Sequence, residues 1–308
     1  MPTTERLKYF LELSNHKTMI EAANALHISP AGLSISIKNL EKELDLQLLY
    51  RKRNEIIFTD NGKKLLVILG DFFSSIAALQ THSKYFSKEI SGELNIYATE
   101  GTIYNALPVI LPHIYNLFPN LKINLKHESY NRLISKVNQS EIPFAFLFQI
   151  KDAQNANLYP TPKNLCFKKL FDCQLLYHIP NRFQEFRMYS SLTSQDLNNY
   201  TLIYNLPKDE NALWFSHNYV TSKQNRIFEE NLALFTSYME NEVGIGQTIY
   251  SNYNKHLPYS FKNCYTLPSG DNEKISFCYI INPKYQLSDV DKQFLDFVTN
   301  FTSLLKKT

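Results

Sequence analysis

Glycine spacing gives the first test for chemistry, because the chain has only eight glycines among its 308 residues. A phosphate-binding P-loop needs two glycines five residues apart, followed by Lys and then Ser or Thr. The sequence contains no such run. Gly244-Ile245-Gly246 is a G-x-G, but it lacks the third glycine of a dinucleotide-binding motif. The sequence therefore argues against the two common kinds of nucleotide-binding enzyme.

Residues that could bind metals or act as nucleophiles are scattered. The four cysteines form no C-x-x-C pair, the eight histidines contain no H-E-x-x-H motif, and no G-x-S-x-G elbow occurs. We therefore expect no enzymatic activity, no metal and no cofactor. Isolated cysteines are typical of a reducing cytosol.

The location of the protein can be predicted from the same sequence. Met1 to His16 contains several charged residues and lacks the long apolar core of a signal peptide. The apolar runs are much shorter than the roughly 18 residues that a membrane span needs. We expect a cytoplasmic protein with no membrane partner.

The first 60 residues have the pattern of a winged helix-turn-helix. Thr18 with Glu21 is a capping box that starts one helix, and Ser29-Pro30 supplies the N-cap and first-turn proline of the next. The apolar residues of that next helix recur at spacings of four, three and four, at Leu33, Ile37, Leu40 and Leu44. Two short strands are predicted between Leu48 and Thr59, with Arg51-Lys52-Arg53 at the tip between them.

Positive charge by itself does not indicate a nucleic-acid partner. The net charge is +3, and residues 1–66 contain ten basic and eight acidic side chains. Placement is more informative, because Arg51, Lys52 and Arg53 at a hairpin tip can reach phosphates or a minor groove. The alternative for this run is a charged turn that only contacts solvent.

A long helix is predicted from about Asp60 to Ile90. Its apolar residues follow a heptad-like spacing, which favours a seam between two copies of the chain, at Leu65, Leu69, Phe72, Ile76, Leu79 and Phe86. The alternative is a helix that packs on its own domain.

The pattern changes after Gly92 to alternating strands and helices. Strands are predicted near 94–98, 121–125, 144–148 and 276–281, and helices at 102–117, 130–139 and 288–307. Similar units are predicted between residues 174 and 250. Such alternation predicts a parallel sheet with right-handed crossovers.

Several of these runs resemble the LysR-type transcriptional regulators. In the first 66 residues the resemblance rests on EAANALHIS (Glu21–Ser29), on Leu33-Ser34 with IKNLEKEL (Ile37–Leu44), and on Leu49, Arg51, Thr59 and Gly62 in the wing. Further along, GELNI (Gly92–Ile96), Leu107-Pro108 with Phe118-Pro119, and VGIG (Val243–Gly246) resemble parts of that family's effector region. The resemblance covers nearly the whole chain.

The resemblance implies an α+β protein with three parts. These are a winged helix-turn-helix DNA-binding domain at 1–59, a linker and dimerisation helix at 60–90, and an α/β effector domain at 91–308. The effector domain resembles a periplasmic binding protein, with one subdomain at about 91–160 and 268–308 and another at about 161–267. Implied partners are double-stranded DNA, a small-molecule effector and further copies of the chain, as a homodimer or homotetramer.

Candidate DNA-binding residues lie around the second helix of the pair and in the wing. They are Thr18, Ser29, Pro30, Ala31, Ser34, Ile35, Ser36, Lys38, Arg51, Lys52 and Arg53. The family's usual S-Q-P-A-L-S-R-Q is here SPAGLSIS, so Pro30 and Ile35 stand where Gln and Arg are common. Isoleucine cannot hydrogen-bond to guanine, although it can contact a thymine methyl group. We expect base preference to differ from the family's usual one.

Residues 98–102 join the first predicted strand to its helix at the carboxyl edge of the sheet, where α/β proteins bind ligands. The resemblance implies effector contacts at Thr99 and Thr102, near residues 201–205 and around Gly246-Gln247, and we add neighbouring residues to give the candidate effector-binding residues. They are Thr99, Glu100, Thr102, Ser129, Phe148, Thr201, Tyr204, Gly246 and Gln247. Glu100 argues against assuming an anionic effector. The alternative for Thr99 and Thr102 is that they only cap the helix.

The sequence therefore predicts a sequence-specific, effector-responsive transcriptional regulator. The alternative is a small-molecule binding protein or enzyme whose N-terminal helices form an oligomerisation module.

Overall fold

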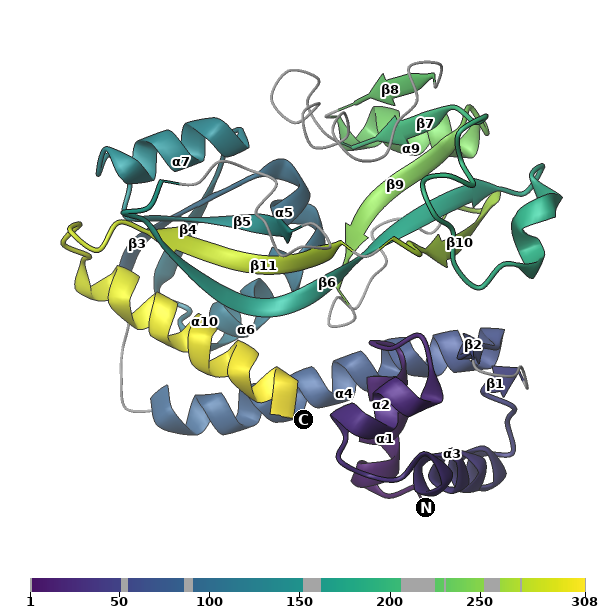
Figure 1. The fold of residues 1–308 in the computed structure, drawn as a ribbon. Coiled ribbons are helices and arrows are strands. Elements are labelled where there is room, and N and C mark those ends of the chain that lie inside the picture. Colours follow the sequence, from purple (N-terminus) through teal and green to yellow (C-terminus); the bar gives the residue numbers. More distant parts are fainter. Residues whose placement is uncertain are drawn as a thin grey trace. The chain divides into compact units, whose positions relative to one another are not determined.

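The computed structural model describes residues 2–50, 55–85, 91–151, 162–205, 225–229, 231–251, 261–271 and 273–307 (Figure 1). The chain falls into two compact units, one at Met1–Ala77 and the other at Ala78–Ser251 with Leu257–Lys307. Among the described residues, no helix is long and apolar enough to cross a membrane.

The first unit contains α1 (Thr4–Leu13), α2 (Met19–Ala25), α3 (Pro30–Leu44), the strands β1 (Leu49–Tyr50) and β2 (Ile57–Phe58), and most of α4 (Asp60–Tyr85). The capping box is confirmed: Thr18 Oγ1 accepts from the Glu21 amide at 3.2 Å, and Glu21 Oε2 accepts from the Thr18 amide at 3.2 Å. Ser29 Oγ accepts from the Gly32 amide at 3.0 Å, which starts α3 as predicted.

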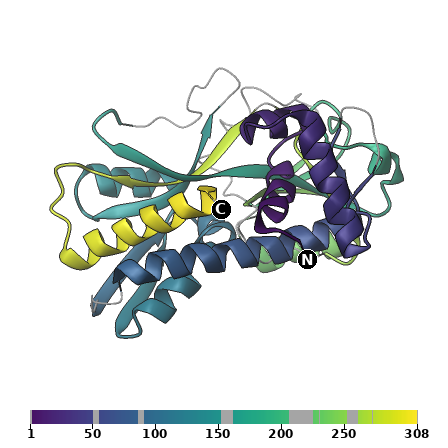
Figure 2. The same cartoon turned by 90° about the horizontal axis from the view of Figure 1, so that it is seen from below.

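One core holds this unit together. Leu33, Ile37 and Leu40 of α3 are buried against residues of α1, α2 and α4, as the apolar spacing predicts. Gly62 allows the start of α4 to pack closely against Leu48, because a Cβ at position 62 would lie 2.2 Å from the Leu48 carbonyl oxygen. Any side chain at position 62 would clash with the Leu48 backbone and would force α4 away from it. Figure 2 shows α4 as one continuous helix.

The first half of the second unit alternates strands and helices. Its elements are β3 (Gly92–Ala98), α5 (Glu100–Asn105), a 3-10 helix η1 (Leu107–Val109), α6 (Leu111–Leu117), β4 (Leu121–His127), α7 (Tyr130–Asn138) and β5 (Phe144–Lys151). The segment expected to be helical at 102–117 is helical, but the structure divides it into three pieces. Prolines stand in the first turns of both η1 and α6, where they cannot donate the amide hydrogen bond of a continuing helix.

The second half contains β6 (Cys166–Pro180), a 3-10 helix η2 (Gln184–Met188), β7 (Leu202–Tyr204), β8 (Arg226–Phe228), α9 (Leu232–Glu240), β9 (Ile245–Tyr250), β10 (Cys264–Pro268), β11 (Lys274–Ile281) and α10 (Asp289–Lys307). The strands form one sheet in the order β4-β3-β5-β11-β6-β9-β7-β8, with β10 also pairing with β6.

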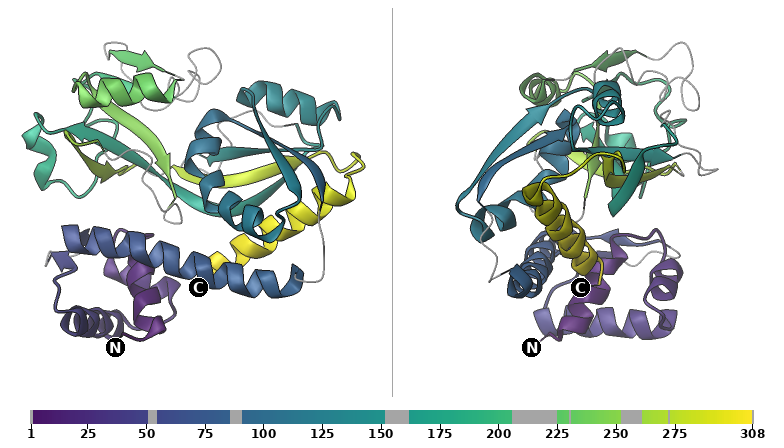
Figure 3. Two further views of the ribbon diagram at one scale, coloured as in Figure 1. Left: turned by 180° about the vertical axis from the view of Figure 1, so that it is seen from behind. Right: turned by 90° about the vertical axis from the view of Figure 1, so that its left-hand side faces the viewer.

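The sheet is mixed, so the prediction of a parallel sheet is only half correct. β3 pairs in parallel with β4 and β5, and β7 pairs in parallel with β8 and β9. Between these two parallel groups, β11 and β6 run antiparallel to their neighbours. The 15-residue strand β6 passes from one lobe of the unit into the other (Figure 3). In the first lobe α7 and α10 cover opposite faces of the sheet (Figure 1).

Candidate functional site

The outer face of α3 carries side chains that the sequence assigned to DNA. The buried residues Leu33, Ile37 and Leu40 define the inner face of this helix. On the opposite side the exposed residues follow the same spacings of four, three and four, at Ala31, Ile35, Lys38 and Lys42. Ile35 is 59% exposed. Ser34 and Ser36 are half-buried beside this face, and Pro30 is exposed at the helix start. We call Ala31, Ile35, Lys38 and Lys42 the outer face of α3.

The two predicted cap residues have structural roles as well. The hydroxyl oxygens of Thr18 and Ser29 accept backbone amides of α2 and α3. Each cap leaves the other first-turn amides of its helix pointing outward, with the partial positive charge of a helix N-terminus. This charge suits a phosphate or the edge of a base.

The two glutamates of α3 bind partners elsewhere in the first unit and do not belong to the outer face of α3. Glu43 pairs with Arg6 of α1. Glu41 Oε1 accepts from the backbone amides of Leu48 at 2.8 Å and Leu49 at 3.1 Å, which ties α3 to the first strand of the wing. Lys38 and Lys42 are therefore the charged side chains that the outer face of α3 presents.

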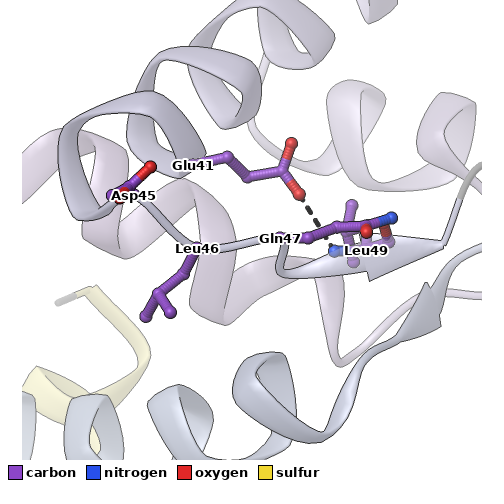
Figure 4. A pocket seen from close by; sticks show the side chains of 5 residues that line it. All are labelled: Glu41, Asp45, Leu46, Gln47 and Leu49. Atoms are coloured by element: carbon purple, nitrogen blue, oxygen red, sulfur yellow. Dashed lines mark hydrogen bonds between the residues drawn. The ribbon is translucent and has the colours of Figure 1, made fainter.

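Figure 4 shows the Glu41 carboxylate directed toward β1. Glu41 lines a pocket of about 400 Å³ together with Asp45, Leu46, Gln47 and Leu49. Gln47 also bonds within this turn, where its Nε2 donates to the Leu49 carbonyl at 3.0 Å. The pocket lies at the C-terminal end of α3, away from the helix start, and includes none of the predicted DNA-binding residues.

Arg51, Lys52 and Arg53 lie outside the described residues, so their role stays a prediction. The strands that flank them are described: Leu49 pairs with Phe58, and Tyr50 pairs with Ile57. A short antiparallel hairpin is therefore present where the wing was expected.

The predicted dimer seam on α4 is divided by the structure. Leu69 is buried in the core of the first unit, and Leu65 and Ile76 pack against that core. Phe72 and Leu79 are exposed, at 42% and 69%. Phe86 lies outside the described residues. The helix therefore packs on its own domain with part of the proposed seam, which was the alternative interpretation, and turns the other part outward.

A different set of residues completes the outward stripe of α4. Ile68 is 61% exposed, and Ser75 is exposed as well. The exposed positions of this stripe follow spacings of four, three and four, at Ile68, Phe72, Ser75 and Leu79. The stripe begins one residue before the buried Leu69. We call these four residues the outer stripe of α4.

The first group of predicted effector residues meets at the carboxyl ends of β3, β4 and β5. Thr99 Oγ1 and Thr102 Oγ1 lie 2.8 Å apart. Thr99 stands at the N-cap of α5 but makes no side-chain cap bond, so capping does not explain its hydroxyl. Glu100 Oε2 lies 4.0 Å from His127 Nε2, and Phe148 is buried beside Gly101.

Ser129 belongs to the same edge. It is the N-cap residue of α7, without a side-chain cap bond, and its buried Oγ has no hydrogen-bond partner among the described residues. The preceding Glu128 is held by Lys136, and this contact lowers the pKa of the Glu128 carboxyl. Its remaining oxygen lies 3.4 Å from Arg132 Nε. The Glu128 carboxylate is therefore paired with two cations, and Glu100 is the other acidic side chain of this edge.

The second group lies across β7 and β9. Tyr204 and Gln247 are directly opposite each other in the parallel pairing, and Tyr177 of β6 is opposite Gln247 on the other side. These three side chains share one face of the sheet, because paired residues point the same way. Burial raises the pKa of Tyr204 to about 12, so its hydroxyl is a neutral donor. Thr201, half-buried, precedes β7.

Gly246 points to the other face of the sheet. A Cβ there would lie 2.3 Å from Met239 Sδ and 3.0 Å from Phe235 Cζ of α9. Its role in the structure is close packing of α9. His178 lies on the same face, where its Nε2 is 2.7 Å from Thr248 Oγ1 and burial lowers the imidazole pKa to about 3.

The two groups come from opposite lobes, and α5 contacts β9. This contact brings the Thr99–Thr102 region toward the strand that carries Gln247. Among the described residues, no group of three or more His, Cys, Asp or Glu side chains could hold a metal ion.

Three residues of these two surfaces were not predicted. Lys42 extends the outer face of α3, and Ile68 and Ser75 belong to the outer stripe of α4. The signal for Lys42 was its position seven residues after Ile35, which places both on one side of a helix. Ile68 could not be separated from the core positions by spacing, since apolar residues occupy both sides of α4.

Comparison with known proteins agrees with this geometry. Residues 4–63 match the family model of the bacterial regulatory helix-turn-helix proteins of the lysR family. A "hydrogen peroxide-inducible genes activator" of Pectobacterium carotovorum subsp. carotovorum is 26% identical over 148 residues, which are 48% of this chain and 49% of that protein. The chain thus spans about half the length of the curated relatives it matches.

Solved structures share the fold across nearly the whole chain. A full-length OxyR variant from Pseudomonas aeruginosa has a TM-score of 0.54 at 15% identity, covering 98% of this chain and 95% of that one. Full-length CbnR in complex with its target DNA has a TM-score of 0.51 at 16% identity, covering 96% and 99%. Residues 4–63 therefore form a lysR-family helix-turn-helix domain, carried by a chain with the fold of full-length LysR-type regulators.

Proposed function

We propose that this protein is a DNA-binding transcriptional regulator whose activity changes when a small molecule binds its second unit. The observation that carries the proposal is the outer face of α3, where a capped helix in a lysR-family domain presents Ala31, Ile35, Lys38 and Lys42 to solvent. Residues near the start of such a helix contact base edges in the major groove, and cations further along contact phosphates. Because chromosomal DNA is the proposed partner, the protein would act in the cytoplasm.

A gel-shift assay on the DNA upstream of its own gene, at two salt concentrations, tests this function. We expect a retained complex that survives an excess of unrelated DNA and weakens as salt rises. A chain that retains no DNA specifically, but turns over a metabolite with saturation, would instead be the enzyme or binding protein of the alternative interpretation.

We further propose that two copies associate through the outer stripe of α4. Ile68, Phe72 and Leu79 expose apolar surface at coiled-coil spacing on a 26-residue helix. A second copy would cover this surface and would hold two α3 helices at a fixed spacing, as a two-part operator requires. Tetramer formation would need a further interface.

The effector site is proposed at the edge that carries Thr99, Thr102 and Ser129, with Gln247 and Tyr204 from the other lobe. Support comes from the Ser129 hydroxyl, which is buried without a partner among the described residues, and from the contact of α5 with β9. A ligand that bound both lobes would shift the population of their arrangements, provided that it bound one arrangement more tightly.

A thermal-shift screen of metabolites against the full-length protein tests the effector site. A ligand of the native state raises the melting temperature. We expect Ser129→Ala to reduce the ligand-induced shift while leaving the melting temperature of the free protein within about one degree, because Ser129 makes no cap bond to lose. If the ligand raised the melting temperature of wild type and variant equally, Ser129 would not be part of the effector site.

The hydrogen peroxide response named for one relative is not part of the proposal. A peroxide-reactive cysteine needs a lowered thiol pKa. Burial raises the thiol pKa of Cys173, that of Cys264 to about 11 and that of Cys278 to about 12. These three thiols are protonated at neutral pH and unsuited to that chemistry, and the fourth cysteine, Cys166, is exposed.

A further inference from the structure

The outer face of α3 changes character along its length. Its first two turns expose Pro30, Ala31 and Ile35, which offer no hydrogen bonds from their side chains, and its later turns expose Lys38 and Lys42. Ser34 is the polar side chain between them and is half-buried. Cations are thus placed for phosphates, while the part of the helix that enters the groove is largely apolar.

Ile35 is not explained by the fold. It lies opposite the buried stripe of Leu33, Ile37 and Leu40, and 59% of its surface is exposed. A single exposed isoleucine is ordinary on a protein surface. Here it stands at the centre of the face proposed to meet DNA, with exposed Ala31 one turn before it, and a β-branched residue lowers helix propensity.

The chemistry of the major groove gives an apolar side chain one partner. Base edges there present hydrogen-bond donors and acceptors, and the 5-methyl group of thymine is the apolar exception. A β-branched side chain in a helix is held in essentially one rotamer, so Ile35 would make this contact with little loss of side-chain entropy.

We propose that Ile35, supported by Ala31, recognises thymine methyl groups and so selects A·T base pairs within each half-site. This inference rests on the proposed DNA-binding function. It assigns specificity to a hydrophobic contact in place of the hydrogen bonds that an Arg at the position of Ile35 could make.

The test begins with operator sites selected by the full-length protein from random duplexes. Each thymine of the selected half-site is then replaced by deoxyuridine, which removes only the 5-methyl group. For the wild-type protein we expect about fourfold weaker binding at one or two positions, the effect of losing one buried methyl group. Ile35→Ser should bind the thymine and deoxyuridine sites equally at those positions.

Lys42→Ala serves as the matched control, since it lies on the same face of α3 but is assigned to phosphate. It should weaken binding to the thymine and deoxyuridine sites by the same factor. The melting temperature of both variants should match wild type, because both side chains are exposed.

Two results would overturn the inference while leaving DNA binding intact. One is a selected site at which no thymine-to-deoxyuridine change alters binding by the wild-type protein. The other is a methyl dependence that Ile35→Ser retains in full. Failure to select any sequence would overturn the proposed function itself, and the inference with it.

Discussion

The helices α3 and α4 belong to the same unit and carry apolar residues at the same spacing, but they use that spacing differently. In α3 the apolar stripe is buried and the opposite face holds two lysines. In α4 a buried stripe with Leu69 and Phe73 lies beside an exposed one with Ile68 and Phe72. Opposite its buried stripe, α3 exposes one large apolar side chain, Ile35, followed by the lysines, whereas α4 exposes a second row of apolar side chains.

This difference shows what a hydrophobic period can identify. A single stripe must face the domain core, because burying it stabilises the domain. When two stripes are present, the domain can bury only one of them. The second remains as exposed apolar surface, which marks a site for another molecule.

The largest expected effect separates the two sides of α4. Leu69→Ala should lower the free energy of unfolding by about 2–5 kcal/mol, because Leu69 is 3% exposed and its removal leaves a cavity. Ile68→Ala, at the neighbouring position, should change it by less than about 0.5 kcal/mol in the monomer. Urea unfolding of dilute protein measures both. Equal losses would mean that Ile68 is also a core residue.

A second prediction concerns association. The double variant Phe72→Ser with Leu79→Ser should weaken self-association more than about tenfold, since two apolar side chains would no longer be buried between copies. Sedimentation at several concentrations measures this, with Ser75→Ala as a control on the same stripe. If the double variant sedimented like wild type, the outer stripe of α4 would not be part of the interface.

A smaller effect is expected on the outer face of α3. Lys42→Ala should reduce the slope of log affinity against log salt by about 0.9 for each phosphate that the variant no longer neutralises. Binding to all sequences should weaken together. Lys292→Ala in α10 is the control, and it should leave the slope unchanged. If Lys42→Ala changed sequence preference instead, Lys42 would contact bases, and the assignment of the lysines of this face to phosphates would be wrong.

The smallest effect is expected at the pair that holds α1 to α3. Glu43→Gln should cost less than about 1 kcal/mol of unfolding free energy, because both partners are 29% exposed and such pairs contribute little. The loss should shrink further in high salt. Unfolding at low and high salt measures it, and a salt-independent loss would mean that Glu43 acts through packing.

Prediction from the sequence was most complete where local signals act. The starts of α2 and α3 follow from Thr18, Glu21, Ser29 and Pro30, since a cap depends on residues three or four apart. The segment predicted as helical at 102–117 is divided in the structure, because Pro108 and Pro112 each lack the amide hydrogen that a continuing helix would use. The strands β3, β4, β5 and β11 were predicted close to their observed positions, but β10 was not predicted. The antiparallel directions of β6 and β11 were also missed, because these strands pair across long distances in the chain.

The candidate site residues divide in the same way. Exposed residues of α3 could be identified by elimination, as those opposite the apolar stripe. Gly246 could not be distinguished from Gln247 by sequence, although the sheet turns one toward α9 and the other toward Tyr204. Adjacent residues of a strand point to opposite faces, and only the pairing partners decide which face is which.

The sequence by itself determined the capped helix pair, the hairpin that follows it, and the apolar inner face of α3, because each depends on residues within a few positions of one another. Tertiary structure decided which stripe of α4 is buried, which carboxylates leave the outer face of α3, and how β6 joins the two lobes of the sheet. These features depend on contacts between residues far apart in the chain. Such contacts stabilise the protein only when folding has brought those residues together.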